Sequence, residues 1–69
     1  MKIFATRLRE LRQEKGMTLK QVSSELCMPL MTYANYEQEK RQPSLETLSL
    51  LCSFYDVSAD YLIGRTDSY

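Results

Sequence analysis

Apolar residues recur along this chain three or four positions apart, which is the spacing of amphipathic helices. In the first segment they are Ile3, Phe4, Leu8 and Leu11. Gly16 follows, and glycine readily takes the left-handed conformation that ends a helix. The pattern predicts a first helix over about 3–15. No alternating strand pattern, repeat or low-complexity segment interrupts the helical spacing, so the fold class is expected to be all-α.

Polar residues mark the starts of further helices. Thr18, with Gln21 three positions later, forms a capping-box pattern and predicts a short second helix over 18–26. Pro29 suits the first turn of a helix, where its missing N–H costs nothing, and it predicts a third helix over 29–38.

Two serines begin the last pair of helices. Ser44 is a good N-cap and Glu46 adds a favourable carboxylate in the first turn, which predicts a fourth helix over 44–55. Ser58 likewise predicts a short fifth helix over 58–63. The expected buried stripe of the fourth helix is Leu45, Leu48, Leu51, Cys52 and Tyr55. The expected architecture is therefore one compact five-helix domain over 1–69.

The second and third helices have the spacing of two short crossing helices joined by a tight turn. The residues expected to face inward are Leu19, Val22, Leu26, Met28, Tyr33 and Tyr36. Those left for an outward face are Leu30, Met31, Thr32, Ala34, Asn35 and Gln38. A basic loop over 39–43 and a further capped helix follow. This order of elements is a DNA-reading layout, and function is expected on the outward face.

The composition is that of a folded protein, with 43% apolar and 26% charged residues. A domain of 69 residues buries only about 60% of its unfolded surface, so a partner or a second copy would add to a small stability margin. No apolar stretch approaches the roughly 20 residues that span a membrane. The start of the chain lacks the apolar run of a secretory signal, which leads us to expect a cytoplasmic location.

The net charge of zero conceals an uneven distribution. Residues 1–20 carry a net charge of +4 and residues 45–69 a net charge of −3. This polarity suits a protein that lays its N-terminal half on phosphates, although an ordinary charged helix surface would give the same pattern.

The chemistry of enzymes and metal sites is not represented in this sequence. There is no histidine to act as a general base or metal ligand, and no glycine-rich phosphate loop. We therefore expect no enzyme, no metal and no cofactor. Cys27 at the turn and Cys52 in the fourth helix are interpreted as small buried hydrophobic residues with free thiols.

Four segments in order carry a resemblance to a known family. They are R-L-R-E-L-R-Q-E-K-G-M-T at 7–18, T-Y-A-N-Y-E at 32–37, K-R-Q-P-S-L-E-T-L at 40–48 and V-S-A-D-Y-L-I-G-R-T-D at 57–67. Over nearly its whole length the chain resembles the lambda-repressor-like (Xre/Cro-type) helix-turn-helix family. The resemblance implies that the third helix enters the major groove and that the second lies across the DNA backbone.

The same resemblance assigns roles to individual residues. The positions from which such proteins read or flank bases are Leu30, Met31, Thr32, Asn35 and Gln38. Lys40 and Arg41 match the basic loop that attaches to phosphates. Arg12 and Glu37 occupy the positions of an ion pair that links the first helix to the third and orients the reading helix.

Three positions depart from the family pattern. The first residue of the second helix, commonly a glutamine that fastens to a phosphate, is Leu19. The turn position usually held by glycine is Cys27, which must accept a left-handed conformation or alter the turn. The usually polar start of the reading helix contains Leu30 and Met31, which can touch a thymine methyl but cannot hydrogen-bond a base edge. Asn35 is left as the best direct reader, through N6 and N7 of adenine.

Taken together, these residues predict a sequence-specific regulator of transcription that binds double-stranded DNA, most simply a repressor. We expect a homodimer on a palindrome with half-sites about one helical turn apart. Its expected dimer surface is the fifth helix and the adjoining tail, through Tyr61, Ile63 and Tyr69. The alternative is an antitoxin or co-regulator that docks a protein partner through Leu30 and Met31.

Overall fold

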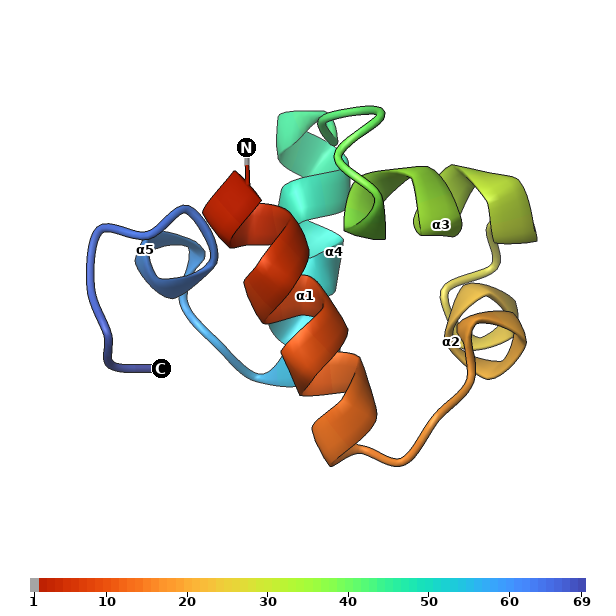
Figure 1. Ribbon diagram of the computed structural model, residues 1–69, viewed down its shortest axis with the longest axis horizontal. Coiled ribbons are helices and arrows are strands. Elements are labelled where there is room, and N and C mark those ends of the chain that lie inside the picture. Colours follow the sequence, from red (N-terminus) through yellow and green to blue (C-terminus); the bar gives the residue numbers. More distant parts are fainter. Residues whose placement is uncertain (1) are drawn as a thin grey trace.

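The computed structural model describes residues 2–69 and places five helices within them (Figure 1). They are α1 (Lys2–Glu14), α2 (Leu19–Glu25), α3 (Leu30–Glu37), α4 (Leu45–Tyr55) and α5 (Ala59–Leu62). The expected all-α fold class is confirmed. The bounds differ from the expected ranges by only one residue at most ends, chiefly because those ranges included the capping residues.

Side-chain hydroxyls cap the starts of α2, α4 and α5. The Thr18 hydroxyl accepts a hydrogen bond from the Gln21 backbone N–H, and the Gln21 side chain accepts one from the Thr18 backbone N–H at 2.8 Å. The hydroxyls of Ser44 and Ser58 cap α4 and α5 by accepting the backbone N–H groups of Thr47 and Tyr61. Pro29 begins α3 without a side-chain hydrogen bond. The local signals in the sequence therefore act where they were expected, because a cap involves only neighbouring residues.

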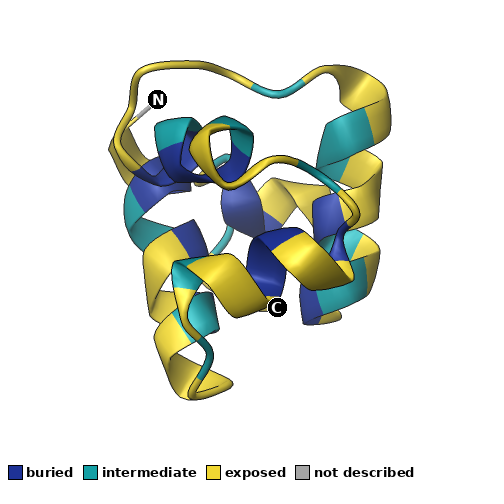
Figure 2. Ribbon diagram, turned by 90° about the vertical axis from the view of Figure 1, so that its right-hand side faces the viewer, coloured by how far each residue is buried: buried dark blue, intermediate teal, exposed yellow. Residues whose placement is uncertain are grey.

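The hydrophobic core is built around α1, which has contacts with both α3 and α5. α5 also packs against α4. Figure 1 shows α1 crossing α4, with α5 and the C-terminus to one side and the α2–α3 pair to the other. The largest fully buried side chains are those of Tyr33, Phe4, Leu8, Leu51, Leu62 and Val22. In Figure 2 the buried positions turn toward the interior on every helix.

Two expectations about burial within the helices are wrong. Ala34 was expected on the outward face of α3, but it is only 4% exposed. The reason is that α3 packs against both α1 and α2, so its buried face is wider than the stripe inferred from Tyr33 and Tyr36. Leu45 was expected in the buried stripe of α4, but it is 85% exposed. It occupies the first position of α4, before that helix reaches the core, and Leu51 lies much deeper.

The turns between helices contain three residues other than glycine with a positive φ. They are Cys27 (56°), Glu39 (64°) and Asp56 (55°). Cys27 was expected to be buried, but the turn between α2 and α3 directs it outward and it is exposed. Of the two alternatives for this position, a left-handed conformation or an altered turn, the structure has the left-handed conformation. Such a conformation costs a side-chain-bearing residue about 1–2 kcal/mol relative to the right-handed one, because its Cβ crowds the following carbonyl.

Replacing Cys27 with glycine is therefore expected to stabilise the domain by about 0.5–1 kcal/mol, since the relief of backbone strain exceeds the extra entropy of the unfolded chain. Urea denaturation monitored by circular dichroism measures the effect. The matched control is Cys27→Ser, which removes the thiol but keeps the strained backbone and should not raise the midpoint. A glycine variant no more stable than the serine variant would show that the turn carries no strain.

Candidate nucleic-acid interface

The outward side of α3 presents a narrow stripe of side chains. Met31 is 61% exposed, Gln38 is exposed, and Asn35 lies between them and is half-buried. Residues four and seven positions apart lie on the same side of a helix, so these three form one row. Leu30 (44% exposed) and the half-buried Thr32 flank the start of this row. We call Leu30, Met31, Thr32, Asn35 and Gln38 the reading face.

The loop after α3 continues this surface with positive charge. Lys40 and Arg41 are both exposed. The Lys40 backbone N–H donates a hydrogen bond to the Asn35 carbonyl at 2.9 Å, which holds the start of the loop against the end of α3. Among the described residues, neither cation takes part in an ion pair. Two unpaired cations therefore stand beside the reading face, where they are available to phosphates.

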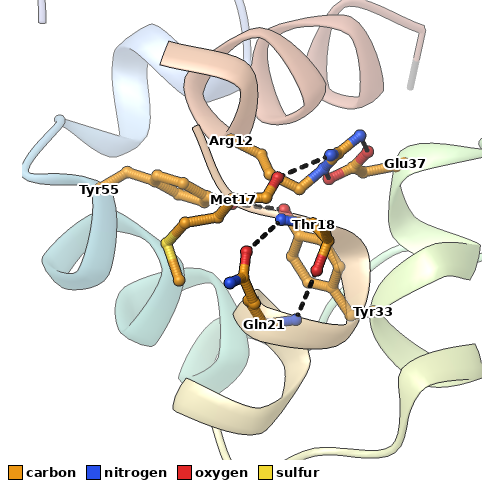
Figure 3. Close-up of polar contacts among 7 residues, drawn as sticks. All are labelled: Arg12, Met17, Thr18, Gln21, Tyr33, Glu37 and Tyr55. Carbon is orange, nitrogen blue, oxygen red and sulfur yellow. Dashed lines mark hydrogen bonds and ion pairs between the residues drawn. The ribbon is translucent and has the colours of Figure 1, made fainter. Parts of the chain in front are cut away.

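An ion pair between α1 and α3 lies beneath the reading face. Arg12 Nε donates to Glu37 Oε2 at 2.9 Å and Arg12 Nη2 donates to Glu37 Oε1 at 3.1 Å (Figure 3). A third bond joins Arg12 Nη1 to the Met17 carbonyl at 3.0 Å. The Glu37 side chain is only 5% exposed. Its hydrogen bonds raise the pKa of Arg12 above its ordinary value, so the guanidinium stays charged.

Two buried tyrosines join α3 to α4 beside this ion pair. The hydroxyls of Tyr33 and Tyr55 lie 2.5 Å apart, close enough for a hydrogen bond (Figure 3). Burial raises the pKa of Tyr33 far above its ordinary value and that of Tyr55 to about 12, so both hydroxyls are neutral near pH 7. Both residues were expected in the core, but their contact was not predicted. The available signal was that a buried tyrosine hydroxyl needs a hydrogen-bond partner.

These bonds connect α3 to the rest of the domain from two directions. Glu37 is held by α1, and Tyr33, one helical turn earlier on α3, is held by the last residue of α4. Within the described residues, every buried side-chain nitrogen and oxygen has a hydrogen-bond partner. Directional bonds of this kind define the angle of a helix more closely than apolar packing does.

The C-terminal tail folds back onto α1 on the opposite side of the molecule from α2. Arg7 Nη1 donates to the carbonyls of Tyr61 and Thr66, both at 2.6 Å, and Nη2 donates to Asp67 at 2.7 Å. The Arg7 guanidinium also lies over the Tyr61 ring, 4.2 Å from its centroid, and Tyr69 contacts the ring edge to face. Arg7 was expected only as surface charge, because its partners lie more than fifty positions away in the sequence.

This arrangement changes the expected dimer surface. Tyr61 is only 9% exposed, because Arg7 and Tyr69 cover its ring. It belongs to the interior of the domain. Of the three residues expected on that surface, Tyr69 is 59% exposed and Ile63 is half-buried.

Other kinds of site find little support in the described part of the chain. Residues 2–69 contain no group of three or more histidine, cysteine or acidic side chains placed to hold a metal ion. Cys27 and Cys52 are free thiols. No helix within residues 2–69 combines the length and the apolar character needed to cross a membrane.

A tight turn joins the short helices α2 and α3, which pack against each other. Bonds from α1 and α4 hold α3, and its outer row of side chains is exposed. This arrangement defines a helix-turn-helix domain. In agreement with this geometry, the family model HTH_3, described as helix-turn-helix, matches residues 8–62. The chain belongs to this helix-turn-helix family of transcriptional regulators, which are not enzymes.

Known relatives carry corresponding descriptions. The uncharacterized HTH-type transcriptional regulator YobD of Bacillus subtilis is 37% identical over 65 residues, covering 94% of this chain and 58% of the relative. The HTH-type transcriptional regulator ImmR of the same organism is 39% identical over 61 residues, covering 88% and 48%. The cryptic phage CTXphi transcriptional repressor RstR of Vibrio cholerae is 29% identical over 66 residues, covering 96% and 60%. The chain thus spans about half the length of the curated relatives it matches.

Proposed function

We propose that this protein is a sequence-specific, double-stranded DNA-binding regulator of transcription that acts in the cytoplasm. The observation that carries the proposal is the reading face of α3 with the unpaired cations Lys40 and Arg41 beside it. In this function α3 enters the major groove and α2 lies across the backbone. The geometry and the family point to the same activity.

Each part of the interface has a distinct role in this proposal. Asn35 reads a base edge, and its amide matches N6 and N7 of adenine. Lys40 and Arg41 attach to phosphates, which strengthens binding without selecting a sequence. Arg12 and Glu37 hold α3 at the angle that brings Asn35 to the base.

The direction of regulation that we favour is repression. RstR is named as a transcriptional repressor, and 96% of the present chain is covered by its match to that protein. A domain that covers a stretch of the major groove and the adjoining phosphates competes with any other protein for the same DNA. Occupancy of the DNA site is therefore sufficient for repression, without contact to a second protein.

We further propose that the protein binds as a homodimer, because paired domains read two half-sites about one helical turn apart. The surface we assign to the contact is α5 with the tail, through Ile63 and Tyr69, with Tyr61 supporting Tyr69 from beneath. Light scattering is expected to give twice the monomer mass, and Tyr69→Ser is expected to shift the equilibrium toward the monomer. A monomer at high concentration, with and without DNA, would contradict this contact.

Selection of duplexes from a random-sequence library by the purified protein tests the proposed function. The expected result is an enriched palindrome whose affinity falls steeply with salt. Weak binding with no enrichment would contradict it. The exposed Leu30 and Met31 would then favour the second candidate, an antitoxin or co-regulator that docks a protein partner through the start of α3.

Removing either loop cation is expected to weaken binding to every DNA sequence. Lys40→Ala or Arg41→Ala should lower the slope of log affinity against log salt by about 0.9 for each lost phosphate contact, because one fewer counterion is released. Fluorescence anisotropy at several salt concentrations measures this slope. The matched control is Arg65→Ala, which removes an exposed cation beyond α5 and should leave the slope unchanged. Equal slopes for all variants would show that the loop does not touch the backbone.

A further inference from the structure

The start of α3 differs in kind from the starts of the helices that have side-chain caps. Thr18, Ser44 and Ser58 each cap a helix with a hydroxyl, whereas Pro29 provides no side-chain hydrogen bond. Directly after Pro29 stand two large apolar residues that the fold does not cover, Leu30 and Met31. The start of α3 therefore has neither a polar side-chain cap nor buried apolar side chains. Departures of this kind from the usual pattern of a helix are expected at ligand-binding sites.

The position of Leu30 and Met31 on α3 indicates which part of the DNA they contact. In helix-turn-helix proteins, the N-terminal residues of the second helix contact base edges. Met31 stands one helical turn before Asn35 in the same exposed row, and unpaired cations lie beyond the far end of α3. An apolar patch at the start of a helix, in one row with an amide and with cations beyond the far end of that helix, is complementary to the floor of a major groove.

Only one apolar group is displayed by the bases in that groove, the methyl group on C5 of a pyrimidine. Leucine has no hydrogen-bonding group and the methionine thioether is only a weak acceptor, so the C5 methyl is the group on a base edge that these side chains fit best. We infer that Leu30 and Met31 read 5-methylpyrimidines, so that the DNA site carries a C5 methyl close to the adenine read by Asn35. This inference rests on the proposed DNA-binding function and specifies the chemistry of its ligand.

The spacing between the two reading residues gives the expected position of the methyl. Met31 and Asn35 are four residues apart, which is about 6 Å along an α-helix. Successive base pairs are about 3.4 Å apart. With α3 along the groove, the methyl read by Met31 lies about two base pairs from the adenine. Thymine supplies this methyl in ordinary DNA, and 5-methylcytosine presents the same group at a C·G pair.

The test uses the duplex obtained by selection, with each thymine replaced in turn by uracil, which removes only the methyl. Loss of one contacted methyl is expected to weaken binding by about fourfold, the equivalent of one buried methylene. The loss should occur at one or two positions near the adenine. Met31→Gln and Leu30→Asn keep similar side-chain lengths but are polar, and each should bind the thymine and uracil duplexes equally at its own position. Met31→Leu stays apolar and should retain the preference for thymine.

Control variants and duplexes separate this inference from the proposed function. Lys40→Ala should bind every duplex more weakly but keep the same ratio between thymine and uracil. Cytosine and 5-methylcytosine at the contacted position should differ in the same direction as uracil and thymine. Equal affinity for thymine and uracil at all positions would overturn the methyl-reading role while leaving sequence-specific binding in place. A uracil effect that persists in both polar variants would also overturn it. Failure of the selection to enrich any site would overturn the proposed function and this inference with it.

Discussion

Replacing Glu37 with alanine is expected to lower the free energy of unfolding by about 3–5 kcal/mol, enough to unfold much of so small a domain. The carboxylate is 5% exposed and receives two hydrogen bonds from Arg12. Its removal leaves the guanidinium partly buried with only the Met17 carbonyl as a partner. Urea denaturation followed by circular dichroism measures the loss. A cost below about 1 kcal/mol would show that the pair behaves as a surface salt bridge.

A second variant separates the stability of the pair from its proposed role in orienting α3. Replacing both partners with apolar residues, Arg12→Met with Glu37→Leu, removes both charges and should recover most of the lost stability. We expect this double variant to fold and yet to bind its preferred DNA site less selectively, because the bidentate bond no longer defines the angle of α3. Unchanged selectivity in a folded double variant would contradict the orienting role.

Replacing Asn35 with alanine is expected to cost about 1–3 kcal/mol of affinity for the preferred DNA site and almost nothing on unrelated DNA. The reading face carries two amides that can match N6 and N7 of adenine, and Asn35 is the one that lies within α3, whereas Gln38 is its C-cap. Anisotropy titrations on the selected duplex and on a scrambled duplex measure the difference. The matched control is Gln13→Ala, which removes an exposed amide from α1. Equal weakening on both duplexes would exclude a reading role for Asn35.

The helices themselves could be predicted from the sequence because their signals are local. The capping box of Thr18 and Gln21, the left-handed Gly16 and the serine caps of α4 and α5 each act within about one turn. The order of the elements then restricted the fold to a small all-α domain. The exposure of Met31, Gln38, Lys40 and Arg41 also agrees with expectation. Residues of a short helix that lie outside its buried stripe, and charged residues of a loop, generally lie on the surface.

The errors concern burial and long-range contacts. Helical spacing predicted an exposed Ala34 and a buried Leu45. The structure has the reverse, because burial depends on where the helices cross. Cys27 is exposed because a left-handed turn directs its side chain outward. The hydrogen bond between Tyr33 and Tyr55 joins residues twenty-two positions apart on two different helices. Hydrophobic periodicity does not indicate which buried hydroxyls form a hydrogen bond with each other.

By itself, the sequence determined where helices begin and end, which residues carry charge, and that an amide and two apolar side chains occupy the outward positions of α3. These properties depend on neighbouring residues and on side-chain chemistry. Only the tertiary structure decided that Ala34 is covered, that Tyr61 lies under Arg7 and Tyr69, and that α3 is held by bonds from both α1 and α4. The physical reason is that burial and hydrogen-bond pairing between helices depend on how the helices cross, which hydrophobic packing sets for the whole chain at once.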